Sequence, residues 1–164
     1  MSARKIVWGI ALVSLIGTDL SALAGPGAAG HGHGAADETA YGQPGDPKAR
    51  SRPVTVTMRE IDGKMVFIPN VIEVKKGEQV RFMMRNSGLL HHEMVLATLE
   101  ENLKHAIEMQ KNPDMEHDDP NAKRLAPEKS GEIIWRFTKA GEFDFSCLIP
   151  GHREAGMTGK VIVK

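Results

Sequence analysis

The most constraining feature of this sequence is the segment from Cys147 to Met157, because it holds the chain's only cysteine together with two further metal-binding side chains. His152 follows Cys147 across Pro150 and Gly151, and Met157 closes the segment. A thiolate, an imidazole and a thioether suit a soft, redox-active metal, above all copper. The segment lacks a second histidine, which another part of the fold must supply.

Short runs of alternating apolar and polar residues surround this segment and predict β-strands. In the run from Gln79 to Arg85, for example, Val80, Phe82 and Met84 should point inward. The predicted strands are 54–58, 65–68, 71–74, 79–85, 92–96, 132–138, 142–147 and 159–164. About seven or eight such strands predict an all-β sandwich of two antiparallel sheets, with the cysteine loop between the last two strands.

The insertion at residues 98–130 interrupts the strand pattern. Thr98 and Glu101 form a capping-box pattern, which predicts a helix over residues 99–111. The apolar residues at helical spacing are Leu99, Leu103, Ala106 and Ile107. After Pro113, the polar and proline-broken residues 114–129 predict a surface loop.

Residues 1–24 have the pattern of a secretory signal peptide. Arg4 and Lys5 precede an apolar run from Ile6 to Ile16, and Ala22-Leu23-Ala24 is a cleavage pattern. The run is short for a membrane span. We expect cleavage after Ala24 and export, the alternative being an uncleaved membrane anchor.

Residues 25–52 predict a disordered leader, because they are rich in Gly, Ala and Pro and lack apolar periodicity. His31 and His33 in this leader could bind Cu(II) or Zn(II) weakly, or they belong to a solvated linker. The folded domain should then span residues 53–164.

The charge balance argues against two classes of partner. The chain has 21 basic and 21 acidic residues, which gives no basic field for nucleic acid and no polybasic patch for a membrane after signal cleavage. In an oxidising compartment a lone thiol such as Cys147 is a liability, and metal binding would remove it. The alternatives are a buried, inert cysteine or an intermolecular disulfide.

Two segments carry a family resemblance. The stretch from Asn86 to Val95 resembles the strand-end segment of the cupredoxins, where a histidine follows an Asn-containing turn. Cys147 to Val161 resembles their ligand loop: its end is similar to plastocyanin, and its step through Pro150 to His152 is closer to azurin and rusticyanin. The resemblance covers residues 53–97 and 131–164. The insertion and the leader are similar in layout to the small exported cupredoxins of copper-tolerance gene clusters.

This resemblance implies a Greek-key β-sandwich that binds one Cu(I)/Cu(II) per chain. The implied ligands are His92, Cys147, His152 and Met157, a type 1 set with a weak axial thioether. The resemblance favours His92 over His91, because the family's ligand histidine is followed directly by the outgoing strand, here Glu93 to Val95. Neighbouring strand residues point to opposite faces, so we do not expect both histidines to reach one metal. Glu93 stands where many cupredoxins have Asn, so any side-chain tie between the two ligand segments must be made differently.

The implied role is that of a periplasmic one-electron copper protein that contributes to copper tolerance. The alternative is a dedicated periplasmic electron carrier between respiratory redox proteins. We expect a monomer that meets a redox partner or a copper-handling protein. We do not expect an enzyme, because Ser146 and Leu148 flank Cys147 where a multicopper oxidase has a histidine, and a binuclear centre needs a second cysteine.

A cluster in the insertion offers an accessory copper site. Its members are His105, Met109, Met115 and His117, together with the acidic residues Glu108, Glu116 and Asp118. Cu(I) would favour the methionines. The alternative is a solvated helix face and loop.

Overall fold

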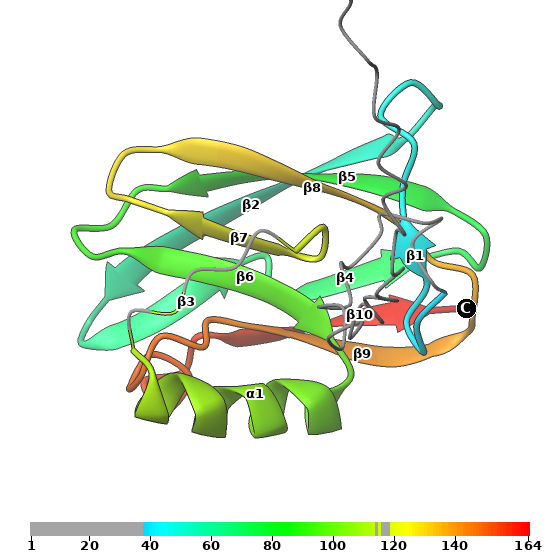
Figure 1. Cartoon of the computed structure of the whole chain (residues 1–164). Coiled ribbons are helices and arrows are strands. Elements are labelled where there is room, and N and C mark those ends of the chain that lie inside the picture. The colour runs from blue at the N-terminus through cyan, green and yellow to red at the C-terminus, as the bar shows by residue number, and fades with distance from the viewer. Residues whose placement is uncertain (1–37, 114, 116–118) are drawn as a thin grey trace, which may run out of the picture. The chain divides into compact units, whose positions relative to one another are not determined.

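The computed structural model describes residues 38–113, 115 and 119–164 and contains, within them, ten strands and one helix (Figure 1). The elements are β1 Gln43–Pro44, β2 Arg52–Ile61, β3 Lys64–Ile68, β4 Val71–Val74, β5 Gln79–Asn86, β6 His92–Ala97, α1 Leu99–Lys111, β7 Ala122–Leu125, β8 Ser130–Arg136, β9 Gly141–Ser146 and β10 Thr158–Val163. The predicted strands are all present, within a few residues at their ends. The predicted all-β fold is confirmed.

The strands form two five-stranded sheets that face each other as a sandwich (Figure 1). Their orders are β1-β8-β5-β2-β3 and β4-β10-β9-β6-β7. Both sheets are mixed rather than antiparallel as predicted, because β2 runs parallel to β5 and β4 runs parallel to β10. The alternation of residues could not reveal this, since it marks the faces of a strand and not its direction.

The space between the sheets is filled by the inward residues of both. Val80, Phe82 and Met84 of β5 are at most 1% exposed, as their alternation predicted. Phe67 and Phe145 meet edge to face, with ring centroids 5.1 Å apart. Trp135, Phe137 and Leu96 are among the fully buried side chains. Burial of this apolar area is the main term that holds the two sheets together.

Residues 39–45 pack on the sandwich, so the expectation of a disordered leader up to residue 52 is wrong for this part. Tyr41 is 6% exposed and stacks on Trp135 with ring centroids 5.2 Å apart. The Trp135 indole N–H donates to the Tyr41 carbonyl, and β1 pairs with β8. The aromatic stack, the hydrogen bond and the strand pairing together order a stretch whose composition alone predicted disorder. The signal peptide, its cleavage site and His31 and His33 lie outside the described residues.

Helix α1 spans the residues predicted, but it buries a different face. The capping box of Thr98 and Glu101 is present. Leu99, Leu103 and Ile107 are 53%, 47% and 54% exposed, whereas Asn102 and Met109 are buried. The Asn102 amide donates to the Val95 carbonyl and to Asp144 Oδ2, so polar bonds to β6 and β9 fix the helix orientation.

The predicted surface loop over residues 114–129 is wrong in its second half. Ala122–Leu125 form strand β7, which pairs antiparallel with the start of β6. Its alternation is short and carries two basic residues, Lys123 and Arg124, so the strand pattern was hidden. The consequence for the site is direct, because Leu125 lies opposite His92 in this register.

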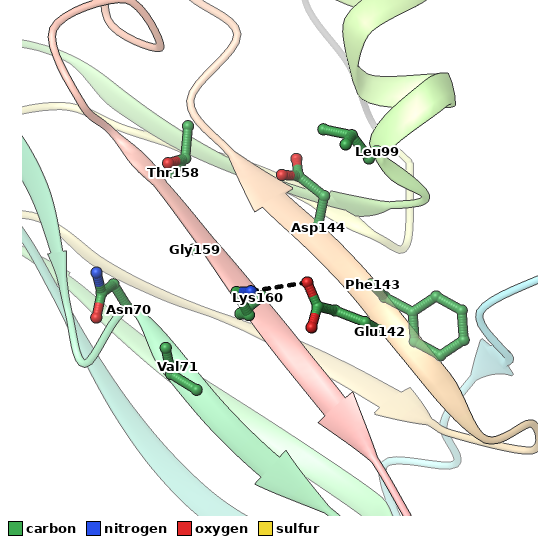
Figure 2. A pocket seen from close by; sticks show the side chains of 9 residues that line it. All are labelled: Asn70, Val71, Leu99, Glu142, Phe143, Asp144, Thr158, Gly159 and Lys160. Atoms are coloured by element: carbon green, nitrogen blue, oxygen red, sulfur yellow. Dashed lines mark hydrogen bonds and ion pairs between the residues drawn. The ribbon is translucent and has the colours of Figure 1, made fainter.

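A surface groove of about 400 Å³ lies where α1 begins beside β9 and β10 (Figure 2). The Lys160–Glu142 ion pair crosses its floor at 2.8 Å. Its lining residues are Asn70, Val71, Leu99, Glu142, Phe143, Asp144, Thr158, Gly159 and Lys160. This lining includes none of the predicted metal ligands. Among the residues described, α1 is not long or apolar enough to cross a membrane.

Candidate metal centre

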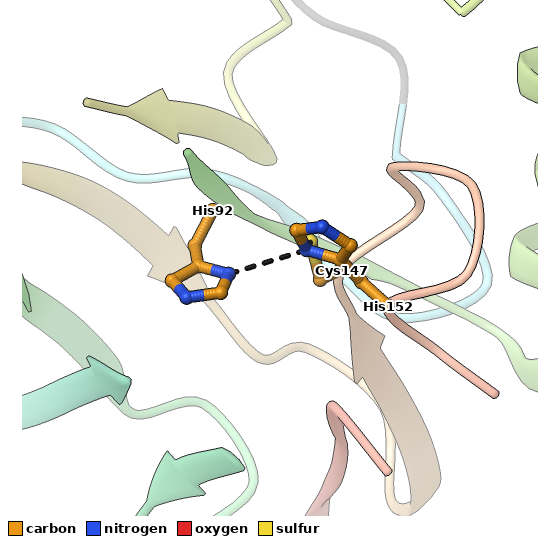
Figure 3. A group of neighbouring side chains, drawn as sticks. All are labelled: His92, Cys147 and His152. Atoms are coloured by element: carbon orange, nitrogen blue, oxygen red, sulfur yellow. Dashed lines mark hydrogen bonds between the residues drawn. The ribbon is translucent and has the colours of Figure 1, made fainter. Parts of the chain in front are cut away.

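Three of the predicted ligands meet in a buried cluster at one end of the sandwich (Figure 3). The donor atoms of His92, Cys147 and His152 all lie within 4.8 Å of one another. His152 Nδ1 is 3.2 Å from His92 Nδ1 and 3.3 Å from Cys147 Sγ. Exposure is 0% for His92 and Cys147 and 8% for His152, so His152 is the most accessible of the three.

The sheet topology brings these residues together from distant parts of the sequence. His92 is the first residue of β6, and Cys147 follows directly after the last residue of β9. These strands are antiparallel neighbours, with Val95 opposite Ser146. The start of one strand therefore lies beside the end of the other, and His152 is carried by the loop between β9 and β10.

The choice between the two adjacent histidines agrees with their burial. His92 is fully buried, whereas His91 is exposed. Leu89 and Leu90, in the turn before β6, are 87% and 45% exposed, so they do not form an apolar shell over the donor cluster.

The loop from Cys147 to Met157 is closed by its own backbone. The Cys147 amide donates to the Met157 carbonyl at 3.1 Å, and the Met157 amide donates to the His152 carbonyl at 3.0 Å. Gly151 and Gly156 have positive φ values of 88° and 103°, which suit glycine. Met157 itself is 0% exposed and belongs to the main core.

Asn86 fixes the turn that leads into His92. Its side-chain amide donates to the carbonyls of Leu90 and Leu125, at 2.7 and 3.0 Å, and its Oδ1 accepts from the Gly88 amide. Asn86 is 0% exposed, so each of these bonds replaces a lost bond to water. The turn is thereby tied to the end of β7.

Glu60 contacts this turn from the end of β2. Its carboxylate accepts from the amides of Leu89 and Leu90, at 2.9 and 3.2 Å, and Oε1 lies 2.7 Å from His92 Nε2. Burial alone would raise the pKa of Glu60, but the bonds from Leu89, His92 and Leu90 outweigh it, so the pKa is lowered. The carboxylate is therefore ionised near neutral pH.

Glu93 makes the tie between the two ligand segments. Its carboxylate accepts from the Leu148 amide at 3.0 Å, and its own amide donates to Cys147 Sγ at 3.4 Å. Glu93 is only 2% exposed. The side-chain tie that the sequence left open thus exists, with a carboxylate oxygen as the acceptor. Amide donation to sulfur is one of the ways in which a protein tunes a thiolate.

Arg153 anchors the loop to β9. Its guanidinium forms an ion pair with Asp144 at 2.9 Å, and it also contacts the Ser146 hydroxyl. Asp144 further accepts from Ser146 and from Asn102 of α1. The side chains of Arg153 and Asp144 are 16% and 11% exposed, so this network is largely shielded from solvent. It links the helix, the strand and the ligand loop.

The buried environment disfavours the charged forms of Cys147 and His152 unless a cation is present. Burial raises the pKa of the Cys147 thiol to about 12, against the opposing effect of the Glu93 amide. Burial, followed by the neighbouring His92, lowers the pKa of His152. A neutral imidazole and a thiol that ionises only for a cation are the donors that a metal site requires.

The donor set fits one metal ion. Imidazole nitrogens bound at about 2.0–2.1 Å, as for zinc, can be no more than about 4.2 Å apart on the same ion. The Nδ1 atoms of His92 and His152 satisfy this limit at 3.2 Å. The sulfur and nitrogen donors select copper or zinc over hard cations. Met157 could add a thioether.

The accessory cluster of the insertion is only partly described. Met109 is fully buried and packs with Val95, Ala122 and Leu148, and Met115 packs on this same small cluster. His105 is half-buried on α1. His117, Glu116 and Asp118 lie outside the described residues. The proposed accessory copper site therefore stays a prediction.

Sequence reasoning missed Glu60 and Arg153. A signal for Glu60 was present, because it shares the inward face of β2 with the buried Val56 and Met58. A charged residue in that position needs a partner. For Arg153 no comparable signal exists, since the loop has no periodicity.

Comparison with known proteins identifies the family. The profile described as copper binding proteins, plastocyanin/azurin family, matches residues 54–164. The chain belongs to this family of copper-binding proteins. The family and the buried His92, Cys147 and His152 cluster together support one copper ion per chain.

Similar proteins include copper-resistant cuproproteins. The copper-resistant cuproprotein CopI of Rubrivivax gelatinosus is 50% identical over 144 residues, which cover 83% of this chain and 86% of the relative. CopI of Pseudomonas aeruginosa is 38% identical over 154 residues, covering 76% of this chain and 83% of the relative.

Solved cupredoxin structures share the fold. Auracyanin B has a TM-score of 0.59 at 22% identity and covers 80% of this chain and 99% of its own. Reduced auracyanin of Roseiflexus castenholzii has a TM-score of 0.56 at 21% identity, covering 67% of this chain and 96% of its own. At these identities the likeness confirms the sandwich, and it says nothing of partners.

Proposed function

We propose that this protein is a mononuclear type 1 copper protein that contributes to copper tolerance. The observation that carries the proposal is the convergence of two imidazole nitrogens and one sulfur in a buried cluster. The similarity to the CopI cuproproteins of Rubrivivax gelatinosus and Pseudomonas aeruginosa supports the tolerance role.

In this proposal each residue has a defined part. Cys147 binds as a thiolate, and His92 and His152 bind through Nδ1, because those are the atoms that face one another. Met157 supplies a weak thioether from its buried position after the loop. Copper bound to this set would supply one-electron redox chemistry. His152, the most accessible of the three clustered residues, would pass the electron between the site and a partner.

Optical spectroscopy of the Cu(II)-loaded protein tests the site. Thiolate coordination predicts intense charge-transfer bands at about 450 and 600 nm, with one copper per chain by metal analysis. Absence of both bands in a copper-loaded sample would overturn the type 1 assignment. Met157→Leu should keep the bands but change their ratio, because only a weak ligand is removed.

Gene deletion tests the role. Cells without the gene should lose viability at copper concentrations that the parent tolerates, and the Cys147→Ala variant should fail to restore it. Restoration by that variant would show that tolerance does not need the thiolate site. Unchanged tolerance together with a respiratory defect would instead favour the dedicated electron carrier, which the closed and buried donor set also suits.

Export, oligomeric state and the absence of catalysis belong to the same proposal. We propose a periplasmic monomer that is not an enzyme, because a site closed by four ligands offers no open position for a substrate. Cell fractionation tests the location, and mass spectrometry of the mature chain tests cleavage after Ala24. Light scattering of the copper-loaded protein tests the oligomeric state.

A further inference from the structure

Glu60 contacts His92 at 2.7 Å, although it is not itself one of the predicted metal ligands. Its carboxylate touches the side of the His92 ring that points away from Cys147 and His152. The His92 ring is 0% exposed, and the Glu60 side chain is 27% exposed. Glu60 therefore places a negative charge between a buried ligand and solvent.

The surrounding backbone is shaped to hold this carboxylate. The amides of Leu89 and Leu90 donate to its two oxygens, which fixes the orientation of the group. Gly88 leaves the space that the carboxylate occupies, since a Cβ at this position would lie 2.8 Å from Glu60 Cδ. The contact with His92 thus has three independent supports in the turn.

The geometry determines which proton His92 carries. A ring N–H at Nε2 can donate to Glu60 Oε1 at 2.7 Å, and this leaves a lone pair on Nδ1. Nδ1 is the atom that faces His152 Nδ1 and the rest of the cluster. A hydrogen bond to a carboxylate is about twice as strong as one to a neutral acceptor.

We propose that Glu60 is a positioning residue that holds His92 in the Nε2–H tautomer and, through its negative charge, favours Cu(II) over Cu(I) at this site. A carboxylate behind a ligating imidazole raises the basicity of the ligand. The higher charge of Cu(II) gains more from that anion than the charge of Cu(I) does. The inference rests on the proposed copper site.

The matched variants are Glu60→Gln and Glu78→Gln. Glu60→Gln removes the charge and keeps an oxygen that can accept from His92. Glu78 also accepts a backbone amide and lies beside a cation, Arg52, but it is at the opposite end of β2 and β5. Each protein is loaded with copper, its optical spectrum is recorded, and its reduction potential is measured by redox titration.

We expect Glu60→Gln to weaken Cu(II) binding about 10-fold or more, with a smaller loss for Cu(I). A tenfold difference between the two losses corresponds to a rise of about 59 mV in the potential of a one-electron couple. Glu78→Gln should leave the potential unchanged. An unchanged potential in Glu60→Gln, or an equal shift in Glu78→Gln, would overturn the inference.

Two further measurements keep the inference testable if Glu60→Gln folds poorly. Gly88→Ala displaces the carboxylate without altering its charge, and it should raise the potential in the same direction. Long-range proton–nitrogen NMR of the Cu(I) protein should show His92 protonated at Nε2, and protonation at Nδ1 would refute the proposed tautomer. If the parent protein lacks charge-transfer bands, the proposed type 1 copper site is wrong. If the parent has the bands and the reduction potential is the same in Glu60→Gln, only the inference about Glu60 is wrong.

Discussion

The two ends of the sandwich differ in how far their polar side chains are buried. At the metal end Cys147, His92 and Glu93 are at most 2% exposed, and their polar atoms bond to neighbouring side chains or to backbone amides. At the far end, the ion pairs of Arg52 with Glu78 and Lys164 with Glu73 are partly exposed, with side-chain exposures of 23% to 66%. The comparison teaches that polar groups are withdrawn from solvent around the donor cluster, whereas the far end keeps these ion pairs at its surface.

The far end is held instead by apolar packing of the chain's early residues. Tyr41 covers Trp135, and the Gln79 side-chain amide at the start of β5 accepts from the Asp46 amide and donates to the Asp46 carbonyl. Substitutions at this end should therefore change stability and leave the copper spectrum alone. Substitutions at the metal end should change both.

The largest expected effect comes from Cys147→Ala. Because the thiolate is the strongest donor of the cluster, the charge-transfer bands should vanish, and copper affinity should fall by more than the roughly 10- to 100-fold typical of a residue behind the ligands. Absorption and competition titration measure this. Met83→Ala, at an exposed position, is the control and should bind copper normally. Charge-transfer bands that persist in Cys147→Ala would show that the copper spectrum does not depend on the thiolate at the metal end.

Tyr41→Ala should give the largest loss of stability at the far end. It removes a 6% exposed ring stacked on Trp135, and aromatic-to-alanine changes in a core cost about 3–5 kcal/mol. Urea unfolding of the apo-protein measures the loss, and the copper spectrum should not change. Tyr41→Phe keeps the stack and loses only the bond from Asn121, so it should cost about 1 kcal/mol or less. A shifted copper spectrum in Tyr41→Ala would show that the two ends are coupled.

Glu93→Ala should lower the free energy of unfolding and shift the charge-transfer bands of the copper-loaded protein. It leaves the buried Leu148 amide without its acceptor, which costs about 1–3 kcal/mol in the free energy of unfolding. The bands should also shift, since the same residue positions an amide at Cys147 Sγ. Glu132→Ala, whose side chain is 51% exposed, is the matched control and should change stability by less than about 1 kcal/mol. Equal losses of unfolding free energy in Glu93→Ala and Glu132→Ala would contradict the difference between the buried metal end and the exposed surface.

Glu78→Gln should give the smallest effect, with a clear pH dependence. The hydrogen bond from Arg52 is the largest cause that lowers the pKa of Glu78 below its ordinary value of 4.5. The unfolded state therefore binds a proton first as pH falls, so the stabilisation is complete above about pH 4.5 and is lost below it. Because the pair is partly exposed, Glu78→Gln should cost less than about 1 kcal/mol at neutral pH and nothing in strong acid. A cost that grew on acidification would contradict the assigned pair.

The ligands could be predicted from the sequence because their signal is local. Cys147, His152 and Met157 share one loop, and His92 follows a turn with a recognisable Asn86. The contact of Glu60 could not be predicted in the same way, since it depends on the parallel register that places Met58 opposite Asn86. Parallel pairing joins strands that are distant in sequence, and alternation does not reveal which strands are neighbours.

The error over helix α1 has a physical reason of the same kind. Spacing identified the apolar stripe of Leu99, Leu103 and Ile107, yet the buried face is set by Asn102, which bonds to β6 and β9. A pattern in one element shows which face could be buried. The partners available on the neighbouring strands decide which face is.

The parallel pairing of β4 with β10 affects the order in which folding and metal binding occur. Val71 to Val74 pair with Lys160 to Val163, which are distant in sequence, and Cys147, His152 and Met157 closely precede β10. Such long-range pairing makes folding slow, because distant segments must meet before their contacts stabilise them. The donor cluster is therefore complete only after β10 has paired with β4, and we expect metal capture to follow, rather than guide, the first steps of folding.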